Sequence, residues 1–390
     1  MLRMGTIQLD FISLAKRSMM TKTPDFSSIP TFAGPPDETQ IKARLRAVAE
    51  LGVFRHALPS VLGGFGDDFA ALVQSHRQLG AACRDPGLML AINAHVWGSV
   101  FPILLYGSEA QKAQFLPPLI SGRWLGGHAI TEPSCGSDVQ AMTTQAELRG
   151  DSYVLNGEKR YITNAPVADC LVVYAKLAGK ICAFLVSRDD DGCRFSDDAA
   201  LNACRGSATG SVILQDCRID ADRLLGKIGA GTQMIQKALE YERAFVFAGI
   251  AGIMDWQLAE VVRYSRERRS AGGHLGKHQA ISHRIAEMKL RLDTIALWLN
   301  ECARLCDAGQ RITLASAQTK LYAAEAFLQS SLDAVQIMGA AGLASGSAMA
   351  ELVQDAMAGR LFSGSSEVQK NLIAALLGTG DAYKTNPLSH

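Results

Sequence analysis

The sequence predicts a mainly helical protein of the α+β class, in which a middle β domain separates two helical regions. Apolar residues recur with the period of an α-helix in the first and last parts of the chain, whereas the middle holds short runs rich in β-branched residues. With 390 residues, 48% of them hydrophobic, the chain can fill a large core divided among two or three domains. We expect a loose lead-in over residues 1–37, a helical domain over 38–127, a β domain over 128–227 and a helix bundle over 228–390.

The first helical region contains the amphipathic segment DETQIKARLRAVAELG and the segment EAQKAQFLPPLISG, which is rich in proline and glycine at its end. Between them, residues 87–107 carry no formal charge and are long enough to span a bilayer. The same stretch also contains Asn93, His95, Ser99 and Pro102. We therefore expect two buried helical pieces that meet near Pro102, with a transmembrane span as the alternative.

The β domain is indicated by several short apolar runs. SYVLNGEKRYITNA contains the pair Asn156–Gly157, a frequent two-residue turn, and predicts a hairpin of two short strands. The runs DCLVVYAKL, KICAFLVS and GSVILQDCRI are also rich in β-branched residues, as strands commonly are. After Gly231 the helical period returns and continues to about residue 378.

Two long helices are expected in the last region. The segment HQAISHRIAEMKLRLDTIALWL carries a heptad-like stripe that is typical of bundle packing, made of Ile281, Ile285, Met288, Leu292, Ile295 and Leu299. The segment ITLASAQTKLYAAEAFLQSSLDAVQIMG holds many small residues, which allow helices to approach closely.

Charge and cysteine usage exclude several classes of protein. A net charge of +1 gives no global field for binding nucleic acid or an acidic membrane surface. The nine cysteines are scattered without a CxxC pair, so we expect a reduced, cytoplasmic protein with no disulfide framework and no metal site. The sequence has no Walker P-loop, and GAGTQM lacks the last glycine of GxGxxG. A nucleotide cofactor would have to be held in another way.

Two polar stretches are candidate binding sites. GGHAITEPSCGSD, residues 126–138, gathers Thr131, Ser134 and Ser137 with three glycines. This composition suits a pyrophosphate or the edge of a flavin, although an ordinary polar loop has it too. RLFSGSSEVQ, residues 360–369, predicts a turn that opens a helix, because Ser365 and Ser366 are favourable N-cap residues. Free N–H groups at such a turn can bind an anion.

Five segments, in this order, resemble motifs of the acyl-CoA dehydrogenase family: FLPPLISGRWLGGHAITEPSCGSDV, YVLNGEKRYITNAPVADCLVVYAK, RERRSAGGHLGKHQAIS, AVQIMGAAGL and GSSEVQKNLIA. The resemblance covers residues 38–378. It implies an N-terminal helical domain, a middle β-barrel and a C-terminal four-helix bundle, with FAD as the cofactor and commonly a tetrameric assembly. Ala271 stands where the family usually has phenylalanine and Ala340 where it usually has glycine. Both departures concern contacts between subunits.

The resemblance also implies which residues bind FAD. The first flavin loop is matched by His128, Ile130, Thr131 and Ser137. The segment that lies against the flavin is matched by Tyr161, Ile162 and Thr163. Residues that reach the FAD of a neighbouring subunit are matched by Arg268, Ser270, Gln279, Gln336 and Gly339. The turn beside the FAD phosphates and adenosine is matched by Ser365 and Glu367.

The chemistry that the resemblance implies needs a carboxylate base, yet the family's commonest position for it holds Ser363. Glu242 is the alternative, because helical spacing places it on an apolar face with Ile235, Leu239, Phe245, Val246 and Gly249. A carboxylate in apolar surroundings is a stronger proton acceptor than one in water. From the residues alone, Glu242 could equally pair with a distant arginine or lie at the edge of the stripe.

The segment YERAFVFAGIAG resembles the helix that carries a Glu–Arg pair and the base in isovaleryl-CoA dehydrogenase and its relatives. By this resemblance Glu242 is the base and Arg243 contacts the acyl carrier arm, while Ser137 and Ser363 also line the substrate. A narrower likeness joins FSGSSEVQK, TNAPVADCLVVYAK and HRIAEMKLRLD to the flavin dehydrogenases that oxidise prolyl groups tethered to peptidyl carrier proteins.

The expected function is FAD-dependent α,β-dehydrogenation of an acyl or aminoacyl thioester in secondary metabolism. The thioester is expected on a phosphopantetheinyl carrier protein, with CoA as the alternative carrier. The expected partners are an electron acceptor such as an electron-transfer flavoprotein and further copies of the chain in a homotetramer, a dimer of dimers. A flavin oxidase or monooxygenase on the same fold, and a non-catalytic flavoprotein, are the competing classes.

Overall fold

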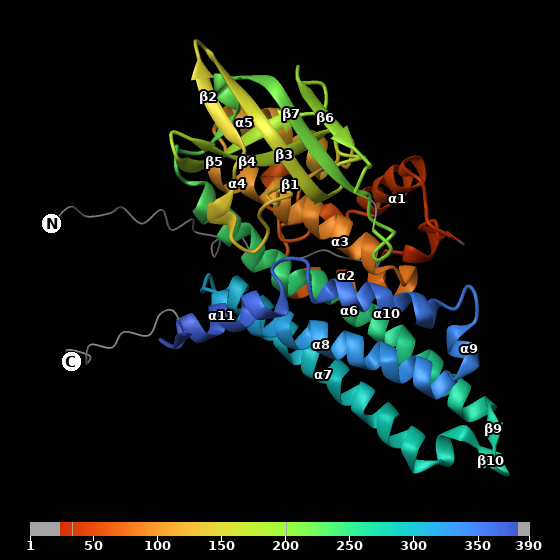
Figure 1. The fold of residues 1–390 in the computed structure, drawn as a ribbon. Coiled ribbons are helices and arrows are strands. Elements are labelled where there is room, and N and C mark those ends of the chain that lie inside the picture. The colour runs from red at the N-terminus through yellow and green to blue at the C-terminus, as the bar shows by residue number, and fades with distance from the viewer. Residues whose placement is uncertain (1–23, 33, 200, 381–390) are drawn as a thin grey trace, which may run out of the picture.

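The computed structural model describes residues 24–32, 34–199 and 201–380. Helices, a β domain and a bundle of long helices follow one another in the predicted order (Figure 1). Most of the predicted lead-in over residues 1–37 lies outside the described residues. The limits of the other predicted domains stay predictions.

The first region of the described chain is built from short helices. They are α1 (Glu38–Glu50), α2 (Phe69–Cys83), α3 (Pro86–His95), α4 (Phe101–Tyr106) and α5 (Glu109–Ile120). The start of α1 is fixed by a capping box, in which the Asp37 side chain accepts from Gln40 N and the Gln40 side chain accepts from Asp37 N. Both bonds satisfy N–H groups that a helix leaves without partners at its first turn.

The apolar stretch 87–107 forms two helical pieces, but their junction differs from the prediction. A π-helical turn, Val96–Val100, joins α3 to α4, and Pro102 is already inside the first turn of α4. A proline there does not break a helix, so it was a poor marker of the junction. Pro86–Tyr106 and α6 (Gly231–Glu267) are long and apolar enough to cross a membrane, yet 89% and 67% of their apolar windows are buried inside the protein.

The β domain of the described chain contains one eight-stranded sheet. Its strands are β1 (Gly126–Ala129), β2 (Gln145–Arg149), β3 (Ser152–Thr163), β4 (Cys170–Leu177), β5 (Lys180–Ser187), β6 (Cys193–Ser196), β7 (Thr209–Asp220) and β8 (Leu224–Leu225). The order is β6-β7-β3-β2-β4-β5-β8, and β1 pairs in parallel with β4. Both faces of β4 are buried: Val173 belongs to the core of the β domain, and Val172 packs with α5 and the start of α6. The continuous apolar run of β4 follows from this position.

The hairpin predicted at Asn156–Gly157 is wrong, because both residues lie inside the long strand β3. The register to β7 shifts between Leu155 and Gly157, which marks a β-bulge. Gly157 has a φ of +152°, and a Cβ there would lie 2.5 Å from Thr144 Oγ1, so only glycine fits. The β2–β3 turn lies instead between Arg149 and Ser152, which face each other as a pair.

The last region is a bundle of long helices (Figure 1). After α6 come the short strands β9 (Arg269–Ser270) and β10 (Gly273–His274), followed by α7 (Gln279–Asp307), α8 (Thr313–Met338), α9 (Ala340–Leu343), α10 (Ala348–Gly359) and α11 (Ser366–Leu376). The central part of the predicted α7 stripe is buried, through Met288, Leu292, Ile295 and Leu299. Buried alanines of α8, among them Ala323 and Ala324, allow its close packing in the same core.

Candidate active site

Glu242 lies in the first third of α6 and is only 4% exposed. The residues that follow it on the helix, Ala244 to Phe247, are fully buried. One carboxylate oxygen is held by the residue at the position where the family commonly has its base: Ser363 Oγ donates to Glu242 Oε1 at 2.5 Å. Ser363, which stands at the usual position of the base, therefore contacts Glu242, the carboxylate predicted to replace it.

Ser363 belongs to the turn between α10 and α11 and has a φ of +54°, in the left-handed region. Arg243 fixes this turn, because its Nε donates to Ser363 O at 3.0 Å. The arginine is buried, which lowers the pKa of its guanidinium, while neighbouring Glu242 acts in the opposite direction. Ser365 closes the turn as the N-cap of α11, accepting from Val368 N. The predicted N-cap role of Ser365 is thus confirmed.

His128, on β1, approaches the other carboxylate oxygen of Glu242. The distance from His128 Nε2 to Glu242 Oε2 is 3.3 Å, without the alignment of a hydrogen bond. The approach depends on a glycine in the π-helical turn: a Cβ at Gly98 would lie 3.0 Å from both the backbone N and the ring Cγ of His128. Three segments far apart in sequence, β1, α6 and the α10–α11 turn, therefore meet at one carboxylate.

The loop that follows β1 carries the predicted flavin residues Ile130, Thr131 and Ser137, which are buried, half-buried and exposed, respectively. A buried ion pair anchors this loop, since Lys159 Nζ donates to Glu132 Oε1 at 2.7 Å and both side chains are almost fully buried. Thr143 and Thr144 also donate to the Glu132 carboxylate, each through its N–H and its hydroxyl. Burial opposes ionisation, but the bonds from Lys159 and the threonines outweigh it and lower the pKa of Glu132 to about 2.

Tyr161 lies near the end of β3, is 53% exposed as a residue and has a φ of +57°. Arg160, the residue before it, donates its backbone N–H to Thr131 O at 2.9 Å and so joins β3 to the flavin loop. The next two residues of β3 are less exposed: Ile162 is buried and Thr163 is half-buried. An exposed aromatic ring beside a loop of hydroxyls and N–H groups is a surface that fits a planar, hydrogen-bonding ring system such as a flavin.

The residues predicted to reach a neighbouring subunit's FAD are not brought to Glu242 within one chain. They are all exposed, and they lie around β9, the start of α7 and the end of α8: Arg268, Ser270, Gln279, Gln336 and Gly339. Ser365 and Glu367 lie at the start of α11, at the opposite end of the bundle from β9 and β10 (Figure 1). The predicted cofactor residues therefore form two separate groups on one subunit.

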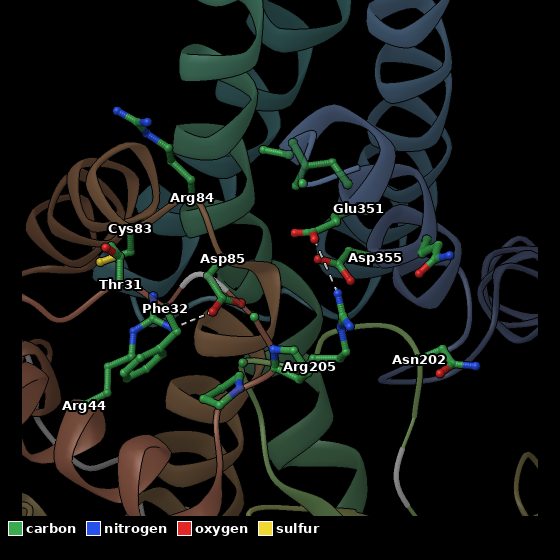
Figure 2. Close-up of a pocket in the computed structure, with 18 residues that line it drawn as sticks. Thr31, Phe32, Arg44, Cys83, Arg84, Asp85, Asn202, Arg205, Glu351 and Asp355 are labelled. Atoms are coloured by element: carbon green, nitrogen blue, oxygen red, sulfur yellow. Dashed lines mark hydrogen bonds and ion pairs between the residues drawn. The ribbon is translucent and has the colours of Figure 1, made fainter. Parts of the chain in front are cut away.

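A cavity of about 260 Å³ lies elsewhere, between the first helices, the loop near Arg205 and α10 (Figure 2). Its walls carry two ion pairs, Arg44–Asp85 at 2.5 Å and Arg205–Glu351 at 3.4 Å. Burial raises the pKa of Asp355, which accepts a hydrogen bond from Cys204 N, to about 7. No predicted site residue lines this cavity, and its polar side chains connect the domains to one another.

Sequence reasoning missed three contacts. The Ser363–Glu242 bond joins residues 121 positions apart, and no pattern in one sequence links them. The same holds for the approach of His128, which the family resemblance assigns to the flavin alone. Nor does the sequence signal the Glu132–Lys159 pair, because Lys159 stands between the charged residues Glu158 and Arg160 in its strand.

Comparisons with known proteins identify the family. Models of the acyl-CoA dehydrogenase N-terminal, middle and C-terminal domains match residues 31–123, 127–217 and 229–378. The L-prolyl-[peptidyl-carrier protein] dehydrogenase of Pseudomonas fluorescens is 35% identical over 331 residues, which are 83% of this chain and 87% of the relative.

Solved structures give the same family. The prolyl acyl carrier protein oxidase AnaB has a TM-score of 0.84 and 33% identity, over 86% of this chain and 90% of that one. PigA with FAD and proline has a TM-score of 0.84 and 28% identity, over 87% and 92%. The predicted family and the predicted mainly helical α+β fold are both confirmed. The chain therefore belongs to the acyl-CoA dehydrogenase family, whose members are FAD-dependent oxidoreductases.

Proposed function

We propose that the protein catalyses the FAD-dependent α,β-dehydrogenation of an acyl or aminoacyl thioester, with Glu242 as the base. One observation carries the proposal: a buried carboxylate lies between the flavin loop and the α10–α11 turn, with one oxygen held by Ser363 and the other without a hydrogen-bond partner among the described residues. A base that is held in place and shielded from water is suited to removing a weakly acidic C–H proton.

In this reaction Glu242 Oε2 takes the proton from the carbon α to the thioester carbonyl. The electrons of that C–H bond form the new Cα=Cβ double bond as the hydrogen on the β carbon leaves with its electron pair. Bound FAD supplies the hydride acceptor, and His128, Thr131 and Tyr161 would hold its ring. The backbone N–H of Ser363 donates a hydrogen bond to the thioester oxygen as enolate charge develops.

The substrate is proposed to be carried by a phosphopantetheinyl carrier protein. The names of the Pseudomonas relative and of AnaB, which concern prolyl groups on carrier proteins, support this choice. The test loads L-proline on a carrier protein and, separately, on CoA, and follows flavin bleaching in a single anaerobic turnover. We expect much faster bleaching with the carrier protein. Equal rates, or a faster reaction with CoA, contradict the carrier assignment, and no bleaching with either favours a non-catalytic flavoprotein.

The electron acceptor is proposed to be an electron-transfer flavoprotein. An oxidase is the second candidate, because AnaB is described as an oxidase although the Pseudomonas relative is described as a dehydrogenase. Mixing the substrate-reduced enzyme with air-saturated buffer separates the two. Slow return of the flavin absorbance in air, and fast return with the acceptor flavoprotein, supports the dehydrogenase, whereas reoxidation in air at the rate of turnover supports the oxidase.

We also propose a homotetramer that works in the cytoplasm, in secondary metabolism. The two separate groups of cofactor residues on one subunit support the assembly, since a neighbouring copy would complete each flavin site. All nine cysteines lie in the described residues as free thiols, which is consistent with a reducing compartment.

A further inference from the structure

The two carboxylate oxygens of Glu242 have different surroundings. Oε1 accepts the hydrogen bond from the Ser363 hydroxyl at 2.5 Å. Oε2 is buried and has no hydrogen-bond partner among the described residues, but His128 Nε2 lies 3.3 Å away. Because Ser363 already occupies Oε1, a proton taken from a substrate arrives on Oε2, on the side of the histidine.

A proton on Glu242 needs a way out of the site, since the glutamate side chain is only 5% exposed. Three polar groups lie on or beside it in the described structure: the hydroxyl of Ser363, the guanidinium of Arg243 and the ring of His128. Ser363 already donates its hydrogen to Oε1, and an arginine offers only donors. His128 is the one member of this set with a ring nitrogen whose lone pair can accept a proton.

His128 also has the geometry of an intermediate carrier. Its side chain is 13% exposed, against 5% for that of Glu242, so the ring lies between the buried carboxylate and solvent. Its Nδ1 is buried without a partner among the described residues, and no carbonyl or carboxylate there holds the ring in one protonation state. A histidine that served only to support β1 would normally have this nitrogen satisfied.

We propose that His128 takes the substrate-derived proton from Glu242 and passes it to solvent, which resets the base. The Oε2–H bond of Glu242 breaks as the Nε2–H bond of His128 forms, and this Nε2–H bond then breaks as its proton passes to water, because Nδ1 is buried; no electrons are transferred. The step requires the tautomer with its hydrogen on Nδ1. His128 acts through Glu242 and does not need to touch the substrate. The inference rests on the proposed function, because it assumes that Glu242 is the base.

The test measures proton exit separately from proton removal. L-Proline deuterated at its α carbon is loaded on the carrier protein and mixed, in ordinary water, with holoenzyme whose flavin has been reduced with dithionite. Hydride transfer is blocked, so the loss of α-deuterium, measured by mass spectrometry of the hydrolysed proline, reports proton removal followed by exchange with solvent. Flavin bleaching of the oxidised enzyme with the same thioester reports proton removal and hydride transfer without the exchange step.

The decisive variant is His128→Gln, whose amide keeps an N–H near Oε2 but cannot carry a proton. We expect α-deuterium loss to fall at least ~10-fold further than single-turnover bleaching, because the glutamate then returns the same deuteron, whereas a weakened contact to the flavin slows both rates alike. Retained FAD absorbance and an unchanged melting temperature serve as controls of folding. Glu240→Gln is the matched control: Glu240 is a second buried acid of α6, hydrogen-bonded to Thr313 and Lys237, and both rates should stay at the parent level.

Two results overturn the relay. Parent-level deuterium loss in His128→Gln means that the proton leaves by another path, and an equal fall of both rates means that His128 only supports the site. Glu242→Gln separates this inference from the function on which it rests. If Glu242→Gln still bleaches its flavin at the parent rate, the base assignment fails. If Glu242→Gln loses both rates while His128→Gln keeps both, the base assignment stands and only the relay is refuted.

Discussion

Ser363 has two separable parts in this site, a hydroxyl that donates to Glu242 and a backbone that forms the turn before α11. The hydroxyl orients the base, but its hydrogen bond also engages electron density of the carboxylate that must accept the proton. These two effects oppose each other during proton transfer. The side chain of Ser363 should therefore matter much less to the rate than the carboxylate that it contacts.

We predict that Ser363→Ala slows single-turnover flavin reduction by at most ~10-fold. A hydrogen bond to a charged group contributes about 1.5–3 kcal/mol, and only the part that changes during proton transfer affects the rate. Stopped-flow bleaching with the carrier-bound substrate measures it, and FAD content confirms that the turn is intact. A loss as large as that of Glu242→Gln would show that the serine hydroxyl takes part in the proton transfer.

At the scale of elements, the flavin loop depends on a buried ion pair that the loop shares with β3. Removing the charge of Glu132 leaves Lys159, which is fully buried, without its counterion. Glu132→Gln should lower the free energy of unfolding by about 3–5 kcal/mol, the usual cost of breaking a buried pair on one side. Chemical denaturation at pH 7 checks this, with Glu147→Gln, a largely exposed glutamate of β2, as the matched control. An unchanged stability would mean that the pair does not anchor the loop.

The pH dependence of the same pair has a defined sign. The folded pKa of Glu132 is about 2, below its ordinary value of 4.5, so folding favours the ionised form. Its stabilisation is complete above pH 4.5 and is lost as the pH falls from 4.5 towards 2. The free energy of unfolding of the parent should therefore fall more steeply over this range than that of Glu132→Gln. Parallel curves would contradict the pairing.

The elements also show what one sequence can and cannot predict. The bundle stripe of α7 was predictable, because burial of one face imposes a period on a helix, whereas α6 is buried on every side from Glu242 to Met254 and its stripe marks no single face. The hairpin at Asn156–Gly157 was not, because a local turn signal competes with the pairing of β3 along its whole length, and the sheet accommodates the glycine as a bulge. The motif likeness supplied the flavin residues, while contacts across β1, α6 and the α10–α11 turn came only from the fold.

At the scale of the whole molecule, one subunit presents two groups of cofactor residues at separate places. Arg268 is exposed beside β9, far along α6 from Glu242. We predict that the protein elutes as a tetramer, with a light-scattering mass near four times 41.8 kDa, and that Arg268→Glu loses FAD during gel filtration because it weakens a neighbour's site. Arg266→Glu, at an equally exposed arginine, is the matched control and should keep its FAD. A monomer that retains FAD in both variants would contradict this arrangement.

The central claim is that Glu242 performs the work of the carboxylate whose usual position holds Ser363. Single-turnover flavin reduction by Glu242→Gln, with the carrier-bound thioester that bleaches the parent enzyme, tests it most directly. Glutamine is nearly isosteric and can still accept the Ser363 hydrogen bond, so FAD content and melting temperature should match the parent. We predict a rate at least ~10²-fold lower, the low end for a positioned base. Reduction at near the parent rate would contradict the claim and place the base elsewhere.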